Sequence, residues 1–292
     1  METAFTSPGH WYRGNLHMHS TESDGQLGPQ EALTWYRELG YDFASLTDHR
    51  KTTDVSTFGD EGFLVIPGTE LDCVDPERDV GYHIVGVGIK PFSQDDATRQ
   101  GPGQALVDLI TRHDGLAIMA HPYWLGQEPS DIMAVSGAVA VEVYNATCAR
   151  PGKEFAMVHW DGLLDRGYRI WGVAADDAHN YVGDAGRGWV MVKAPELTEA
   201  AIRQALIEGR FYATQGPAIV DMRLVGDRIE VHSSPVQKIR FISNRGRGRT
   251  VEAEPGGAIT AASFPAPPRG YVRVECIDHR GLRAWSQPLF FD

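Results

Sequence analysis

Histidine and carboxylate residues stand at the ends of several strand-like segments of this sequence. His17 and His19 alternate along one such segment, so both imidazoles would lie on one face about 6–7 Å apart. Further residues of metal-ligand type follow later apolar runs: Asp24, His49, Glu70, His83, His121, Asp177 and His179. Nine ligands are too many for one zinc ion, which takes about four. Because mixed imidazole and carboxylate ligation suits Zn, Mn or Fe, the sequence predicts two or three divalent metal ions of this kind.

A centre of this composition is typical of hydrolysis, because metal-bound water supplies hydroxide at neutral pH. The carboxylates Asp24, Glu70 and Asp177 carry less charge than two or three dications, so the site would be locally cationic. We therefore expect a small anionic substrate, such as a phosphorylated molecule.

Three residues in strand-end loops are candidate substrate-binding residues: Arg150, Arg187 and Asn145. Each arginine could clamp an anionic group through a bidentate fork, and the alternative for each is a solvated loop side chain. Glu142, near Asn145, could simply pair with a neighbour.

Short apolar runs alternate with segments of helical spacing over the first two thirds of the chain. The predicted strands are Arg13–Met18, Phe43–Thr47, Phe63–Pro67, His83–Val87, Leu116–Ala120, Val139–Tyr144 and Ile170–Ala174. The predicted helices are Pro29–Leu39, Gln104–Arg112, Lys153–Asp165 and Glu196–Glu208. This alternation indicates parallel strands with crossovers, in a barrel or an open α/β sheet, and functional groups gather at the carboxyl ends of such strands.

The pattern changes after the last predicted helix. Short alternating runs separated by Gly, Pro, Asn and Asp predict a small all-β, sandwich-like domain over residues 218–292, behind a first domain over residues 1–217. Asn244–Arg249 and Ala261–Pro268 are predicted loops. The basic run from Lys238 to Arg249 could touch nucleic acid, but no aromatic residues interleave it, which favours a solvated hairpin.

These motifs resemble, in order, those of the polymerase and histidinol phosphatase (PHP) superfamily of metallohydrolases. The matching segments are His17-Met18-His19, Ser23-Asp24-Gly25, Thr47-Asp48-His49, Pro67-Gly68-Thr69-Glu70, the strand of His83, Ala120-His121-Pro122 and Asp177-Ala178-His179. The resemblance covers residues 10 to 217. It implies an α/β fold, a distorted seven-stranded β/α barrel with a two- or three-metal centre.

The resemblance also assigns ligands to ions. His17, His19, Glu70 and Asp177 would hold one ion, and Glu70 would bridge it to a second held with His83 and His121. Asp24, His49 and His179 would hold a third and are the predicted catalytic residues. Asp176 departs from the family pattern, where a small residue is usual. Its carboxylate could bind metal or orient His49 or His179, while Asp48 is expected to support the ligands.

A later stretch, Ala205 to Pro217, is more similar to the carbaryl hydrolase-like branch of the superfamily. The leading hypothesis is a metal-dependent phosphoesterase acting through a metal-bridging hydroxide. An ester or carbamate hydrolase with the same centre is the alternative, and a nuclease or a non-catalytic binding module is less favoured.

Composition narrows the class of protein further. The 292 residues carry a net charge of -12, which argues against nucleic-acid or anionic membrane surfaces as partners. The three cysteines lack metal-type spacing, and the N-terminus lacks the pattern of a secretory signal, so we expect a cytoplasmic protein. Five of the 11 histidines, His10, His113, His159, His232 and His279, have no ligand-type companions and are predicted to be structural.

Overall fold

The computed structural model describes residues 3–292, apart from the side chains of residues 96 and 97. Its first elements are β1 (His10–Asn15), α1 (Pro29–Glu38), β2 (Phe43–Leu46), β3 (Leu64–Asp75), β4 (Val80–Val87), η1 (Asp96–Arg99), α2 (Gly103–Arg112), β5 (Leu116–Met119), α3 (Pro122–Leu125) and α4 (Pro129–Met133). Then follow β6 (Ala140–Asn145), η2 (Thr147–Ala149), α5 (Met157–Leu164), β7 (Trp171–Ala175), α6 (Tyr181–Asp184), β8 (Trp189–Ala194), α7 (Glu199–Ile207) and β9 (Phe211–Thr214). The last are β10 (Ile219–Val225), β11 (Arg228–Val236), β12 (Lys238–Ser243), η3 (Asn244–Gly246), β13 (Gly248–Glu252), β14 (Ile259–Pro265), β15 (Gly270–Ile277), β16 (Arg283–Ser286) and β17 (Leu289–Phe291).

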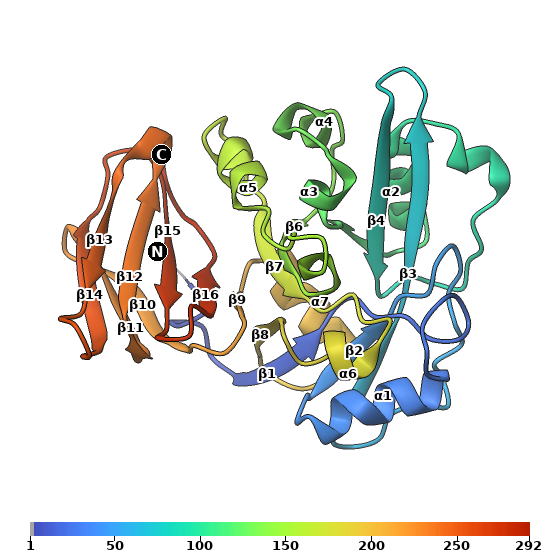
Figure 1. Cartoon of the computed structure of the whole chain (residues 1–292), viewed down its shortest axis with the longest axis horizontal. Coiled ribbons are helices and arrows are strands. Elements are labelled where there is room, and N and C mark those ends of the chain that lie inside the picture. Colours follow the sequence, from blue (N-terminus) through green and yellow to red (C-terminus); the bar gives the residue numbers. More distant parts are fainter. Residues whose placement is uncertain (1–2) are drawn as a thin grey trace.

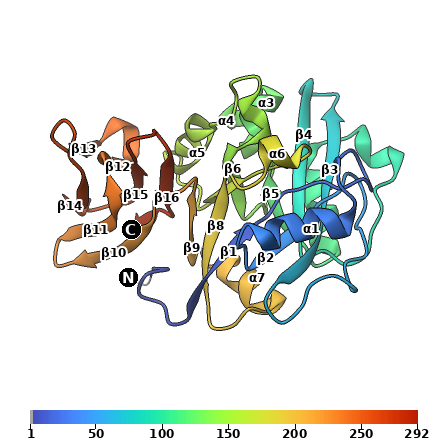
Figure 2. The same cartoon turned by 60° about the horizontal axis from the view of Figure 1, so that its bottom comes forward.

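One long sheet runs through the molecule in the order β13-β12-β15-β16-β9-β8-β1-β2-β3-β4-β5-β6-β7. Both views place β3 and β4 at one end of the molecule and the C-terminal strands at the other (Figures 1 and 2). The strands β1, β2 and β3 are mutually parallel, as are β5, β6 and β7. The predicted mixed α/β fold with parallel strands is therefore confirmed.

Strand β4 departs from the prediction, because it runs antiparallel to both β3 and β5. Only residues 76–79 separate β3 from β4. A parallel connection needs a crossover of about a dozen residues, so this link can only be a hairpin. Strand β8 is likewise antiparallel to β1, and β9 to β8.

The row of strands curves so that the carboxyl ends of β1 and β7 meet. Met18 and Ala178 form a parallel bridge, His19 N donates to Ala178 O at 3.0 Å, and Asp177 N donates to His17 O at 2.9 Å. Residues at the two ends of the row, far apart in sequence, thereby lie side by side. Closure into a seven-stranded barrel stays a prediction.

Two helices show how the sequence holds this row of strands in place. Helix α1 begins with Pro29, its residue Glu31 accepts a hydrogen bond from Gly28 N, and it buries Leu33 and Tyr36. Helix α2 buries Leu106 and Ile110 over β3 and β4. Full burial of each such aliphatic side chain contributes roughly 1.5–3 kcal/mol, so the helices are held mainly by their apolar faces.

The strands after residue 217 share an apolar core that includes Ile229, Val231, Phe241 and Val274, and Phe5 and Trp11 of the N-terminal segment pack against it. β14 pairs with β11 over most of the stretch predicted as the loop 261–268, so that prediction is wrong there. The short Ala and Ser side chains of this segment gave no strand-like pattern in the sequence. In the structure, Phe264 pairs with Ile229 across the two strands. β16 pairs with β9, so the long sheet continues across residue 217. The domain boundary at that residue stays a prediction.

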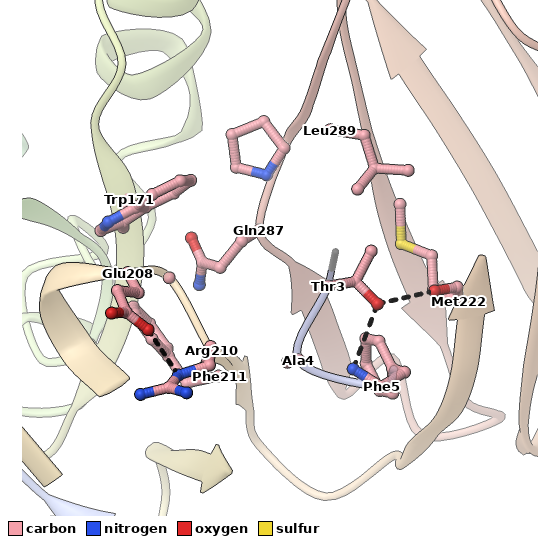
Figure 3. Close-up of a pocket in the computed structure, with 12 residues that line it drawn as sticks. Thr3, Ala4, Phe5, Trp171, Glu208, Arg210, Phe211, Met222, Gln287 and Leu289 are labelled. Carbon is pink, nitrogen blue, oxygen red and sulfur yellow. Dashed lines mark hydrogen bonds and ion pairs between the residues drawn. The ribbon is translucent and has the colours of Figure 1, made fainter. Parts of the chain in front are cut away.

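A cavity of about 270 Å³ lies where the N-terminal segment, the turn between α7 and β9, and the C-terminal strands meet (Figure 3). In it, Thr3 Oγ1 donates to Met222 O at 3.2 Å. The buried Gln287 amide reaches back to β7, where Oε1 accepts from Gly172 N and Nε2 donates to Gly172 O, both at 2.8 Å. One side chain thus satisfies both backbone groups of a buried strand residue.

Gln287→Ala should lower the free energy of unfolding by about 2–3 kcal/mol, because it leaves Gly172 N and O buried without partners. Urea unfolding followed by circular dichroism measures this loss. Gln30→Ala, at an exposed position of α1, is the control and should change stability by less than about 0.5 kcal/mol. Equal stabilities of the two variants would contradict the anchoring role.

Among the residues described, no helix combines the length and the apolar character that crossing a membrane requires.

Candidate metal centre

All nine predicted ligands come together at the carboxyl ends of the strands β1, β2, β5 and β7, beside β3 and β4. They form three groups, within each of which the ligand atoms lie within 4.8 Å of one another. The groups are His17, His19, Glu70 and Asp177; Glu70, His83 and His121; and His19, Asp24, His49 and His179. These are the sets that the family resemblance implied, except that His19 also joins the third.

The first group is fully buried. The Nε2 atoms of His17 and His19 lie 3.2 Å apart, and each lies 3.3 Å from Glu70 Oε2. Asp177 Oδ1 lies 3.3 Å from His17 Nε2 and 3.0 Å from His19 Nε2. Two imidazole nitrogens and two carboxylate oxygens therefore surround one point, which is the donor set of a tetrahedral Zn²⁺ or a related dication.

Glu70 connects the first group to the second. Its Oε2 faces the first group, while its Oε1 lies 2.8 Å from His83 Nδ1 and 3.0 Å from His121 Nε2. Glu70 sits inside β3, and β4 pairs with β3 in a register that sets His83 on the neighbouring strand. The hairpin that the sequence did not predict therefore delivers His83 to this site.

The third group is the most open. Asp24 has 55% of its side chain exposed, and its oxygens lie 3.3 Å from His179 Nε2 and 3.4 Å from His49 Nε2. His49 Nδ1 lies 3.1 Å from Glu70 Oε2 but is not aligned for a hydrogen bond, so it is a buried nitrogen without a partner. An unsatisfied ring nitrogen aimed at a carboxylate fits a site built for a cation.

Glu142 holds two of the candidate ligands in place through hydrogen bonds on the side away from the ligand groups. It accepts from His17 Nδ1 at 2.7 Å, from His121 N at 2.8 Å and from Asn145 Nδ2 at 2.8 Å. A hydrogen bond from His17 Nδ1 leaves the lone pair on Nε2, which is the nitrogen that faces the first group. The sequence pointed to Glu142 only as a residue that pairs with a neighbour, because two of its three partners, His17 and His121, follow the ends of other strands, β1 and β5.

Glu142→Gln should weaken metal binding by about 10- to 100-fold, because an amide at this position no longer holds His17 in the required tautomer. Competition with a chelator of known affinity measures the change. Glu38→Gln, at an exposed position of α1, should leave the affinity unaltered. An affinity unchanged in both variants would show that Glu142 has no influence on the ligands.

The substrate-binding candidates lie in different surroundings. Arg150 lines the cavity over the ligands, where Nη2 donates to Asp184 Oδ1 at 2.9 Å. Asn145 is buried and donates to Glu142 and, at 3.1 Å, to Asp177 Oδ2. Arg187 Nε donates to Gly183 O in α6. Of the three, Arg150 alone is among the residues that line the cavity.

Asp176 points away from the metal-type residues. It accepts from Tyr36 Oη at 2.9 Å, from Gly186 N at 2.7 Å and from Gly188 N at 2.8 Å. Burial raises the pKa of Asp176 to about 6 although these bonds oppose the shift. The expectation that Asp176 binds metal or orients His49 or His179 is therefore wrong, because its carboxylate ties α1 to the loop before β8.

Asp48 holds the loop that follows β1. Its carboxylate accepts from Ser20 N at 2.7 Å, from Ser23 Oγ at 2.9 Å and from Thr53 Oγ1 at 2.6 Å. Asp24 follows Ser23 directly, so Asp48 orders the segment that presents Asp24 to the third group.

The charges of the cluster couple its histidines to its carboxylates. Burial alone would lower the pKa of His19, but hydrogen bonds to Asp177 and Glu70 raise it to about 9. The pKa of His17 is likewise raised well above its usual value, against burial, by Asp177, Glu70 and Glu142. Burial would raise the pKa of Glu70, yet His17, His83 and His121 hold it well below its usual range. The carboxylates are therefore ionised at neutral pH, ready to bind cations.

The cavity over the three groups has a volume of about 360 Å³, which suits a small ligand. Its lining residues are Asp24, His49, Glu70, His83, His121, Trp124, Thr147, Cys148, Arg150, Asp177 and His179. Trp124 and Thr147 were not singled out in the sequence, because neither residue type alone marks a binding site.

No model of a known protein family matches the chain. No curated protein matches it either. Among solved structures, a two-domain protein from Bacteroides vulgatus ATCC 8482, described as containing a predicted PHP-like metal-dependent phosphoesterase, superposes with a TM-score of 0.53 at 16% identity over 95% of both chains. The chain therefore shares the fold of that protein, over both the metal-site region and the C-terminal strands.

Two further structures are more distant. An amidohydrolase from Chromobacterium violaceum with bound sulfate and no metal matches 68% of this chain and 96% of its own, with a TM-score of 0.46 and 18% identity. A candidate metal-dependent phosphoesterase from Bifidobacterium adolescentis matches 57% of this chain and 87% of its own, with a TM-score of 0.44 and 14% identity.

Proposed function

We propose that this chain is a metal-dependent phosphoesterase that acts on a small phosphorylated substrate. One observation carries the proposal, namely that Glu70 presents its two oxygens to two neighbouring ligand groups at the floor of the cavity. Two adjacent cation sites that share a carboxylate suit phosphate esters, because a two-metal site stabilises both the attacking and the leaving oxygen of an in-line displacement. The fold shared with a PHP-like protein supports the proposal.

The residues of the three groups would hold divalent ions, with Zn, Mn or Fe as the expected elements. Such ions would supply charge for a phosphoryl oxygen and a nucleophilic hydroxide at neutral pH. The buried carboxylates Glu70 and Asp177 and the tautomer of His17 set by Glu142 keep the donor atoms in place.

Asp24, His49 and His179 are the proposed catalytic residues. His179 Nδ1 lies 2.8 Å from Asp177 O and donates to it, which leaves Nε2 directed toward Asp24 and the cavity. In protein whose third group holds no ion, a protonated Nε2 of His179 or of His49 would be placed to give a proton to the leaving-group oxygen. The Arg150 guanidinium, held by Asp184, would orient the anionic substrate from the wall of the cavity.

The test is a substrate screen with protein loaded in turn with Zn, Mn and Fe. We expect turnover of p-nitrophenyl phosphate that EDTA abolishes, with bis(p-nitrophenyl) phosphate as the diester arm. Failure to turn over any phosphate ester with any metal would overturn the proposal. Hydrolysis of aryl acetates or aryl carbamates alone would favour the second candidate, which attacks a carbonyl at the same centre.

The motif stretch from Ala205 to Pro217 favours that second candidate, through its resemblance to the carbaryl hydrolase-like branch. A nuclease is less favoured because of the net charge of -12. The closed seven-stranded barrel, the small all-β domain over residues 218–292 and the cytoplasmic location belong to the same proposal.

A further inference from the structure

Trp124 is a large aromatic residue exposed beside a polar site. Its side chain is 46% exposed, although it lines the cavity over the metal-type residues. The ring centroid lies 5.9 Å from that of His83 and 5.2 Å from that of His121, at interplanar angles of 64° and 85°. The indole therefore stands beside the second ligand group, on the wall of the cavity.

The short helix α3 holds Trp124 in this position. His121, with a φ of 25°, turns the chain out of β5, and Pro122 starts the helix. Just after α3, Gln127 Nε2 donates to Gly81 O at 2.8 Å and Gln127 O lies 2.7 Å from His159 Nε2. Both ends of the helix are anchored, so the exposed indole occupies a defined place.

An exposed indole loses little conformational entropy when a flat ligand covers it, because the side chain has only two torsions. Stacking of a planar ring on an aromatic side chain is favourable for any planar ring, and it requires no specific hydrogen bonds. Arg150, in the loop after the next strand β6, lines the same cavity. Its guanidinium is suited to bind an anionic group of the ligand. Together the two side chains fit a ligand that joins an anion to a planar ring.

We propose that Trp124 is a specificity-determining residue that stacks on the planar aromatic or heteroaromatic leaving group of the substrate. This inference rests on the proposed function, because it places the phosphoryl group at the ligand groups and the ring of an aryl phosphate ester against the indole. The nearest aromatic neighbour on α3, Tyr123, faces elsewhere, with its ring 5.5 Å from Lys153 Nζ.

The experiment compares kcat/KM for 1-naphthyl phosphate and propyl phosphate in the metal-loaded wild type and in Trp124→Leu, Trp124→Phe and Tyr123→Leu. For Trp124→Leu we expect about a tenfold loss with the naphthyl ester and a change of less than about twofold with the propyl ester. Trp124→Phe should keep most of the naphthyl activity, and Tyr123→Leu should keep both activities. Equal losses with both esters, or no loss with either, would overturn the inference.

A binding measurement separates this inference from the proposed function. The probes are 1-naphthylphosphonate and propylphosphonate, which are not hydrolysed, titrated into the metal-loaded wild type and Trp124→Leu. Tighter binding of the naphthyl probe that disappears in Trp124→Leu supports the stacking role even if no phosphate ester is turned over. Equal affinities of the two probes for the wild type would refute it, even if the protein proves to be a phosphoesterase.

Discussion

Replacing Glu70 with glutamine should lower kcat/KM for a phosphomonoester by about a thousandfold or more and reduce the bound metal measured by elemental analysis. Loss of several kcal/mol of transition-state charge stabilisation corresponds to an effect of this size. Because Glu70 Oε2 faces His17 and His19 while Oε1 faces His83 and His121, one substitution affects two ligand groups. An amide keeps one oxygen and turns a donor toward the other group, so it cannot serve both.

The control for this variant is Glu61→Gln, which makes the same chemical change at an exposed position. It should bind metal and turn over substrate as the wild type does. Circular dichroism of Glu70→Gln checks that the chain still folds. If Glu70→Gln kept the metal content and the activity of Glu61→Gln, Glu70 would not be shared between two sites.

The convergence of the nine candidate ligands could be predicted from the sequence because it depends on local features. Each ligand type stands at or near the end of an apolar run, and parallel strands direct those ends to one edge. His17 and His19 show this most directly, since two alternating residues of one extended segment just beyond β1 suffice to place both rings together. The two rings lie together in the structure because the residues alternate along an extended segment, and this alternation can be read from three consecutive residues of the sequence.

Features that depend on pairing between distant segments could not be predicted in this way. The antiparallel β4, which brings His83 beside Glu70, follows from the register of a hairpin. Glu142 can accept hydrogen bonds from His17 and His121 only when β1, β5 and β6 lie together. The Asp176 carboxylate points away from the cluster because it accepts hydrogen bonds from Tyr36 and Gly186. Which face a carboxylate occupies depends on partners that spacing along the chain does not reveal.

The β14 strand shows the same limit in the C-terminal region. Its segment is rich in Ala and Pro and was predicted as a loop, yet it pairs with β11. The stabilisation comes from the cross-strand contacts of residues such as Phe264 with the apolar core, and propensity along the segment gives little sign of it.

Removal of metal should make the stability of the protein depend on pH between about pH 6.5 and 9. In the metal-free protein, Asp177 and Glu70 raise the pKa of His19 to about 9, and the pKa of His17 is also raised. A raised histidine pKa stabilises the fold fully below the unfolded value of about 6.5, and this stabilisation is lost as pH rises through the folded value. For His19 alone the loss is about 3 kcal/mol, so the Tm of the metal-free protein should fall by about 5–10 °C across this range.

The same protonation opposes metal binding, because a ligating imidazole must be neutral. At pH 7.5 the metal-free protein carries protons on His17 and His19, and binding of a dication to the first group should release them. Calorimetric titration with Zn²⁺ in buffers of different ionisation enthalpy counts the released protons, and we expect about two. The difference in Tm between metal-loaded and metal-free protein should therefore widen as pH rises from 6.5 to 9. Zn²⁺ binding without proton release, together with a metal-free Tm that stays level over this range, would show that these histidines are not held protonated by Asp177 and Glu70.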